Sequence, residues 1–291
     1  MRIWLQNKIV PERLAKVSVL DRGFLYGDGV YEAVRVYEGR IFRAEHHWKR
    51  LDGSLGSIHM RIPWSHSHLT AACLATARAN GLSEALVRVT LSRGQGEVGY
   101  DPRSAKRPTL TVIASPIRKD LPRLWRSGVK IAVVNIRRNP MRSLSPAIKH
   151  TNALNGILAK IEALKTGAFE GVFLNLEGFV AEGTISNIFM VKRGVVKTPS
   201  LDCGILEGVT RRSVLELARK DRVRVVESRI PLKELLAADE VFLTSTTMEV
   251  MPVARIVPGR ASPRTPGPVT RLLQKSLREL IAKELRLRGP I

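Results

Sequence analysis

The sequence predicts an α+β fold in two domains. Within residues 1–118, short strands and amphipathic helices occur in separate runs rather than in strict alternation. A polar stretch with a proline and a glycine follows at 119–128, and a second series of strands and helices opens at Val129. We therefore expect an N-terminal α+β domain at 1–118, an interdomain linker at 119–128 and a C-terminal domain at 129–291.

Apolar periodicity supplies the elements of the first domain. The pattern predicts helices at 46–60 and 67–80 and strands at 2–10, 30–37, 40–43, 85–92 and 109–116. Three glycines between positions 23 and 29 predict a sharply turning loop before the strand at 30–37. Alternation along that strand places Tyr31 and Arg35 on one face and Glu32 on the other.

The second domain is predicted from the same signals. Strands are expected at 129–136, 171–175, 179–181, 188–191, 195–199, 224–227 and 240–244, and helices at 151–165, 210–220 and 269–287. The helix at 151–165 carries one apolar stripe, formed by Leu154, Ile157, Leu158, Ile161 and Leu164. Four prolines and two glycines at 258–268 predict a loop, and the helix after it is expected to dock on the domain.

Composition places the chain among soluble globular proteins. It has 291 residues, of which 44% are hydrophobic and 25% charged, so it can bury sizeable cores. No apolar run is long enough to span a membrane, and the N-terminus lacks a signal-peptide core. Cys73 and Cys203 lack metal-binding spacing, so we expect no metal site and a reducing, cytoplasmic location.

The net charge of +22 would attract polyanions such as nucleic acid. Lysines and arginines are spread along the chain, however, without a run of five or more and without a nucleic-acid-binding motif. We therefore expect no nucleic-acid partner. A basic nucleic-acid-binding protein that keeps an inactive enzyme fold remains the alternative from another functional class.

Lys149 is the first candidate for chemistry. It lies between the strand at 129–136 and the helix at 151–165, directly after Pro146, Ala147 and Ile148. An apolar wall there would favour the neutral amine that carbonyl chemistry requires. Taken alone, the stretch fits an ordinary surface lysine better, because functional groups with perturbed protonation are the exception.

Two further segments could hold an anion. Gly208 precedes a helix start at Val209 and Thr210, where free N–H groups and the helix dipole favour negative charge. Thr244–Thr247 offers hydroxyl groups directly after a strand. Each also fits an ordinary helix cap or polar loop. Glu182, at a strand end beside Gly183, could keep a ligand nitrogen protonated, with a turn glutamate as the alternative.

These residues together resemble a known family. Lys149, Glu182, Gly208–Arg211 and Thr244–Glu249 occur in the order and spacing of the fold-type IV, or class IV, pyridoxal-phosphate enzymes. That family includes branched-chain and D-amino-acid aminotransferases and aminodeoxychorismate lyases. Asp21–Glu32 and His47–Leu51 are similar to its two N-terminal motifs, so the resemblance covers roughly residues 2–285.

The resemblance implies a fold, a cofactor and a set of roles. The fold would pair a smaller N-terminal α/β sandwich domain with a larger, β-barrel-like C-terminal domain and flanking helices. The cofactor would be pyridoxal 5′-phosphate, and the assembly a homodimer. Lys149 would bind the cofactor covalently and act as general acid–base, and Glu182 would pair with the ring nitrogen. The phosphate contacts would be Arg50, Val209, Thr210, Ser245 and Thr246, and the substrate contacts Tyr26, Tyr31, Arg35, Arg88 and Thr247.

The family motifs in this chain favour different substrates. Arg88 and the loop at 93–102 are similar to the branched-chain enzymes, whereas D-amino-acid enzymes place an arginine and a histidine where this chain has Val98 and Tyr100. The strand at 30–37 departs from the branched-chain motif, because Tyr31 is the residue of the D-amino-acid motif.

Two more positions and one stretch bear on the same choice. Ala33 departs from the glycine of the branched-chain motif, and Leu154 stands where many branched-chain enzymes have a tyrosine. The stretch 138–150 is similar to the lyases. We expect a transaminase that moves an amino group between a branched-chain L-amino acid and 2-oxoglutarate. A D-amino-acid aminotransferase and an aminodeoxychorismate lyase remain the alternatives.

Overall fold

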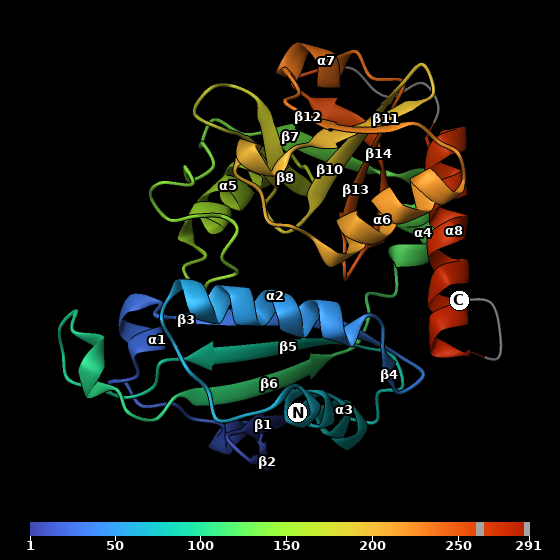
Figure 1. Cartoon of the computed structure of the whole chain (residues 1–291). Helices are drawn as coiled ribbons and strands as arrows, with labels where there is room; N and C mark the ends of the chain where they lie inside the picture. The colour runs from blue at the N-terminus through green and yellow to red at the C-terminus, as the bar shows by residue number, and fades with distance from the viewer. Residues whose placement is uncertain (260–264, 288–291) are drawn as a thin grey trace. The chain divides into compact units, whose positions relative to one another are not determined.

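The computed structural model describes residues 1–259 and 265–287 and divides the chain into two compact units (Figure 1). Unit 1 comprises Met1–Ile117 and Ile148–Ala153, and unit 2 comprises Arg118–Ala147 and Leu154–Ile291. The segment around Lys149 is thus clustered with the first unit, although it lies in the predicted 129–291 domain. The predicted linker contains a short helix, α4 (Leu121–Ser127), within unit 2.

Unit 1 contains a six-stranded antiparallel sheet in the order β2-β1-β6-β5-β3-β4. The strands are β1 (Arg2–Leu5), β2 (Lys8–Pro11), β3 (Gly29–Tyr37), β4 (Arg40–Ile41), β5 (Ala85–Ser92) and β6 (Thr109–Ser115). The helices are α1 (Arg22–Tyr26), α2 (Ala44–Ser57) and α3 (His66–Ala79). The single strand predicted at 2–10 is a hairpin, β1 and β2.

The period-2 pattern of the central strands builds the core of unit 1. Val34 of β3, Val89 of β5 and Val112 of β6 are fully buried and pack with Trp48 of α2 and Leu69 of α3. Alternate residues point to opposite faces of the sheet, so these valines leave the intervening residues on the other face. Tyr31 and Arg88 are on that second face, next to each other on β3 and β5.

Unit 2 contains an eight-stranded sheet in the order β12-β11-β10-β13-β14-β7-β8-β9. The strands are β7 (Val129–Val133), β8 (Glu170–Leu174), β9 (Val180–Gly183), β10 (Asn187–Lys192), β11 (Val195–Pro199), β12 (Val225–Ser228), β13 (Glu240–Ser245) and β14 (Glu249–Val257). The edge strand β9 also lies against β10 and β11 from the other half of the sheet. The sheet therefore curls, which confirms the β-barrel-like second domain.

Helices flank this curled sheet (Figure 1). Besides α4 they are α5 (Leu154–Lys165), α6 (Val209–Lys220), α7 (Leu232–Leu236) and α8 (Pro268–Leu285). As expected, α8 docks: Leu273, Leu277 and Ile281 are buried, and the helix packs on α6, β13 and β14. No helix in the described ranges is both long and apolar enough to cross a membrane.

The structure differs from the sequence prediction at two elements, β14 and α5. β14, in the middle of the curled sheet, was not predicted, because Pro252 interrupts it and proline is unusual in a central strand. The stripe on α5 is exposed rather than packed against the domain. Of the loop predicted at 258–268, residues 260–264 lie outside the described residues.

Candidate active site

The backbone around Lys149 is fixed along the edge of β3. Tyr31 donates its N–H to the carbonyl of Lys149 at 2.9 Å, and Thr151 donates to the carbonyl of Gly29 at 2.9 Å. The N–H of Lys149 is itself bonded to the hydroxyl of Ser54 on α2, at 3.1 Å. Bonds to two different elements hold this loop in one conformation, which is the positioning that a reactive lysine needs.

The Lys149 ammonium lies over an aromatic ring. Its Nζ is 4.5 Å from the centroid of Tyr31, and the guanidinium carbon of Arg88 is 3.7 Å from the same centroid. The charge of Lys149 lowers the pKa of the Tyr31 phenol, burial of the ring opposes this effect, and Arg88 adds to the lowering. Two cations around one phenol form a site that favours an anion.

Arg50 is held by a buried carboxylate. Its Nε donates to Glu32 Oε1 at 2.7 Å and its Nη2 to Glu32 Oε2 at 2.8 Å, and His47 Nδ1 lies 3.0 Å from Oε2. Burial by itself would raise the pKa of Glu32, but Arg50 and His47 outweigh it and hold the pKa well below its ordinary value of 4.5. The guanidinium plane of Arg50 is therefore fixed before any ligand arrives.

The other two unit 1 candidates contact different parts of the unit. The hydroxyl of Tyr26 accepts the N–H of Gly99 at 2.8 Å, so Tyr26 anchors the loop at 93–102. Arg35 pairs with Glu84 at 3.3 Å and stacks on Tyr37 at 4.3 Å. Tyr31, Arg88 and Lys149 come together, whereas Tyr26 and Arg35 make these other contacts.

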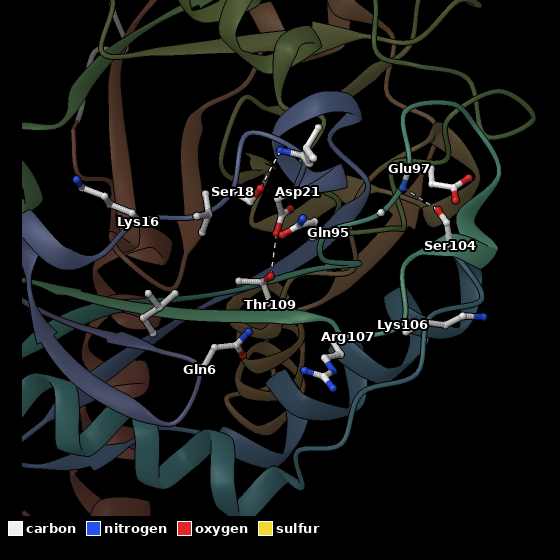
Figure 2. Close-up of a pocket in the computed structure, with 14 residues that line it drawn as sticks. Gln6, Lys16, Ser18, Asp21, Gln95, Glu97, Ser104, Lys106, Arg107 and Thr109 are labelled. Atoms are coloured by element: carbon white, nitrogen blue, oxygen red, sulfur yellow. Dashed lines mark hydrogen bonds between the residues drawn. The ribbon is translucent and has the colours of Figure 1, made fainter.

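Figure 2 shows an open pocket of about 890 Å³ on unit 1. Gln6, Lys16, Asp21, Gln95 and Arg107 are among the residues that line it, and none of the predicted site residues is. Its buried carboxylate, Asp21, already accepts bonds from Gly23, Ser92 and Thr109 at 2.8–2.9 Å. The pocket is therefore separate from the Lys149 cluster, and its acid serves to fix local structure.

Glu182 of unit 2 is buried at the centre of a hydrogen-bond network. Its Oε1 accepts from Nε and Nη2 of Arg138 at 2.9 and 2.8 Å. Its Oε2 accepts from the N–H of Leu206 at 2.9 Å and from Nδ2 of Asn187 at 3.3 Å. These bonds hold the buried carboxyl group in one orientation beside a guanidinium.

The start of α6 lacks a capping side chain. Gly208 is its N-cap residue, so the N–H groups at Val209 and Thr210 receive no side-chain oxygen. A Cβ at Gly208 would lie 2.1 Å from Asn187 Oδ1, so only glycine fits beside that asparagine. An uncapped N-terminus of a helix this long is ready to bind an anion.

The end of β13 lies beside the same asparagine. Asn187 pairs with Thr244 across β10 and β13, and Ser245 accepts the N–H of Met248 at 3.1 Å. The hydroxyl of Thr244 is buried and has no hydrogen-bond partner among the described residues. Ser245, Thr246 and Thr247 continue the chain from there, half-buried. Glu182, Gly208 and Thr244 are thus brought together around Asn187.

Two residues of these clusters were not assigned a role from the sequence. Arg138 lies in the stretch similar to the lyases, and Asn187 lies five positions after Glu182. Arg138 lies 44 positions from the carboxylate it holds, so no local pattern links the two. The signal that could have indicated Asn187 is its position one strand after Glu182, in a stretch of buried residues.

Comparison with known proteins supplies independent evidence. The model of the family described as amino-transferase class IV matches residues 29–256. A putative branched-chain-amino-acid aminotransferase of Methanocaldococcus jannaschii is 41% identical over 97% of both chains. A D-alanine aminotransferase of Bacillus licheniformis is 31% identical over 98% of both chains.

The structure is also similar to solved ones. The branched-chain aminotransferase of the archaeon Thermoproteus uzoniensis, crystallised with norvaline, superposes with a TM-score of 0.89 at 35% identity. The match covers 98% of this chain and 96% of the other. The structural match therefore includes both units of this chain.

Proposed function

The chain belongs to the class IV aminotransferase family, and on that basis we propose that it is a pyridoxal-phosphate-dependent transaminase of branched-chain L-amino acids. The acceptor would be a 2-oxo acid such as 2-oxoglutarate, and a second copy of the chain would complete a homodimer. The observation that carries the chemistry is Lys149, held by backbone bonds on both sides, with its amine over the ring of Tyr31, which Arg88 also contacts.

The residues present fit the cofactor. Its phosphate requires a site with unpaired donors, and unit 2 offers the uncapped start of α6 and the unpartnered hydroxyl of buried Thr244. Its ring nitrogen requires a nearby anion to remain protonated, and the carboxyl group of Glu182, held by Arg138, would supply that charge. When bound, pyridoxal phosphate supplies an aldehyde for the amine and a ring that withdraws electrons.

Each residue then has one task. Lys149 would hold the cofactor covalently, and its freed amine would move the proton at the substrate Cα, a transfer typically worth ~10²–10⁴-fold in rate. Val209, Thr210, Ser245 and Thr246 would bind the phosphate, and Arg50, which Glu32 holds, is the proposed phosphate contact from unit 1. Glu182 would keep the ring nitrogen protonated.

The substrate carboxylate needs a cationic site. Arg88 beside Tyr31 supplies one, and both lie on the polar face of the first sheet. Arg35, Tyr26 and Thr247 complete the proposed substrate contacts, Tyr26 through the loop at 93–102 that it anchors. Val98 and Tyr100 of that loop are exposed and carry no positive charge, so they offer no second carboxylate grip.

Half-reactions test the substrate. The purified, cofactor-loaded protein is mixed with L-leucine, L-glutamate, D-alanine or aminodeoxychorismate without a 2-oxo acid, and the visible absorbance band of the cofactor is followed. We expect rapid loss of the band with L-leucine and L-glutamate. Rapid loss with D-alanine alone would contradict the substrate, and release of pyruvate from aminodeoxychorismate would indicate the lyase.

A D-amino-acid aminotransferase is the second candidate, because Tyr31 matches that motif and contacts both Lys149 and Arg88. Tyr31→Phe separates the two functions. If the phenol helps to select the substrate, the ratio of the rates with L-leucine and D-alanine changes. If it only packs beside Lys149, both rates change together.

A further inference from the structure

The turn between β13 and β14 carries three of the proposed ligand contacts, Ser245, Thr246 and Thr247. Ser245 pairs with Glu249 across the two strands, so Thr246, Thr247 and Met248 alone reverse the chain. Glu249 has a φ of +56°, a left-handed conformation that residues other than glycine rarely adopt. Such a conformation costs free energy and persists only where its surroundings impose it. Other parts of unit 2 must therefore hold this turn in shape.

Two backbone carbonyls beyond the turn accept bonds from helix side chains. Trp125 Nε1 of α4 donates to the carbonyl of Met248 at 2.8 Å. Gln274 Nε2 of α8 donates to the carbonyl of Val250 at 3.1 Å and to that of Trp125 at 3.2 Å. Both helices lie beside β14 (Figure 1). These bonds tie the two helices to each other and to the start of β14.

Arg278 of α8 holds the residue with the positive φ. Its Nε donates to Glu249 Oε2 at 3.3 Å, and its guanidinium carbon lies 4.2 Å from the ring centroid of Trp125. Arg278 follows Gln274 by one helical turn, so both project from the same face of α8. We call Trp125, Gln274 and Arg278 the α4–α8 bracket.

The α4–α8 bracket acts on one side of the turn, and the proposed ligand contacts lie on the other. It is bonded to Met248, Glu249 and Val250, which follow the half-buried residues 245–247. The N–H of Met248 donates to the hydroxyl of Ser245 at 3.1 Å. This bond crosses the turn, so a shift of the held side would move a proposed phosphate contact.

Charge alone does not explain the carboxylate in this place. Glu249 is buried directly across from Ser245, where its negative charge would repel a bound phosphate. A group that opposes binding by its charge can still favour binding by holding the turn. Its bond to Arg278 and its left-handed φ both indicate that second role.

We propose that the α4–α8 bracket consists of positioning residues, which hold Glu249 in its left-handed conformation and thereby fix the turn at 245–247 for the phosphate of the ligand. The inference rests on the proposed function, because it names residues behind the phosphate site of that proposal. It also gives α4, in the predicted linker, and the terminal helix α8 a part in ligand binding.

Binding of inorganic phosphate to the cofactor-free chain tests the role of Arg278. Arg278→Met keeps an unbranched side chain over Trp125 but removes the bond to Glu249. It should raise the phosphate dissociation constant, measured by calorimetry, by roughly 10-fold, the size of one lost hydrogen bond. Lys275→Met is the matched control, because it removes one positive charge from an exposed position of the same helix. It should bind phosphate like the wild type.

Glu249→Gln separates position from charge. Loss of a carboxylate beside an anion site should tighten phosphate binding if charge decides, and weaken it if the bond to Arg278 holds the turn. The double variant Arg278→Met, Glu249→Gln has lost one charge of each sign. Charge alone predicts that it regains the wild-type affinity, whereas the bracket predicts that it binds about as weakly as Arg278→Met.

Hydrogen exchange tests the same residues without a ligand. In the cofactor-free chain, amides of residues 245–250 should exchange faster in Arg278→Met than in the wild type, and Arg278→Lys should restore part of their protection. Trp125→Phe keeps an aromatic ring under Arg278 and removes the bond to Met248, so it provides a second, milder variant that should also weaken phosphate binding. Thermal unfolding checks that each variant is folded.

Several results would overturn the inference. They are a double variant that binds phosphate as well as the wild type, unchanged exchange at 245–250, or a wild type that binds no phosphate. Normal phosphate binding by Arg278→Met in a chain with transaminase activity would contradict the inference and leave the proposed function standing. Weakened phosphate binding in a chain whose loaded form reacts with no amino acid would contradict the proposed function alone.

Discussion

The two units hold their candidate residues by different means. In unit 1, the candidate side chains contact one another. Glu32 holds Arg50 and His47, while Lys149 and Arg88 both contact the ring of Tyr31. In unit 2, Glu182 is paired with Arg138. The start of α6 and the hydroxyl of Thr244 keep hydrogen-bonding groups without a side-chain partner. Changes in the unit 1 cluster should therefore affect folding first, and changes in unit 2 should affect ligand binding first.

The largest effect should come from Glu32. Glu32→Gln leaves Arg50 and buried His47 without their carboxylate, and breaking a buried pair typically costs about 3–5 kcal/mol. We expect a loss of that size in the free energy of unfolding by urea. Glu45→Gln, in the exposed first turn of α2, the helix that carries His47 and Arg50, should change it little. Equal losses in the two variants would mean that the buried cluster is not what stabilises unit 1.

Arg138 should affect the cofactor more than the fold. Arg138→Gln leaves Glu182 buried without its guanidinium, which favours the protonated acid and weakens its hold on a ring nitrogen. A lost charge-assisted bond should weaken cofactor binding by roughly 10–100-fold, measured by titrating the cofactor-free protein. Arg138→Lys should bind the cofactor with an affinity between those of the wild type and Arg138→Gln. Arg137→Gln, at the exposed neighbouring position, should bind it like the wild type. Unchanged binding in Arg138→Gln would remove Arg138 from the site.

Gly208 tests the anion site directly. In Gly208→Ala the new methyl would lie 2.1 Å from Asn187 Oδ1, so the start of α6 must shift. We expect overpacking to cost about 1–3 kcal/mol and binding of inorganic phosphate to be lost. Gly53→Ala is the control on a helix with open space, and it should stabilise by about 0.5–1 kcal/mol. Phosphate binding that survives in Gly208→Ala would place the anion elsewhere.

The pH responses of the two units should differ in sign. Burial lowers the pKa of His47 from its ordinary 6.5 despite Glu32, so the folded state prefers the neutral ring and unit 1 loses stability as the pH falls below 6.5. Burial raises the pKa of Glu170 in β8 above 4.5, so unit 2 loses stability as the pH rises above 4.5.

Hydrogen exchange between pH 4.5 and 7 can separate these responses. On acidification, amides of β3 and α2 should lose protection, and those of β8 should not. His47→Gln should remove the loss of protection in β3 and α2 on acidification. Glu170→Gln should change only the response of β8. Parallel responses in β3 and β8 would contradict the comparison.

Local patterns predicted most of the fold. The strands at 85–92 and 195–199 were predicted with their observed bounds, because apolar residues and turn residues mark both ends. β14 was missed, since Pro252 argues against a central strand that tertiary packing nevertheless forms. The five-residue α1 was also missed, although Asp21 caps its start and Gly27 ends it at a φ of +64°.

The candidate residues could be selected from the sequence by residue type, but their hydrogen-bond partners could not. Lys149 and Glu182 were singled out from their positions at element ends, and spacing suggested the start of α6. The pairs Arg138–Glu182 and Arg50–Glu32 join residues 44 and 18 positions apart, so only the fold reveals them. The exposure of the apolar stripe on α5 was likewise invisible, because periodicity shows that a helix has two faces but not which one is buried.

The most direct test of the central claim is to locate the cofactor on the chain. The loaded protein is reduced with borohydride, which makes the reversible bond between a lysine and the cofactor permanent, and its peptides are analysed by mass spectrometry. We predict one modified peptide, carrying the mass of the reduced cofactor on Lys149, and none from Lys149→Ala. Modification of a different lysine, or of none, would contradict the account.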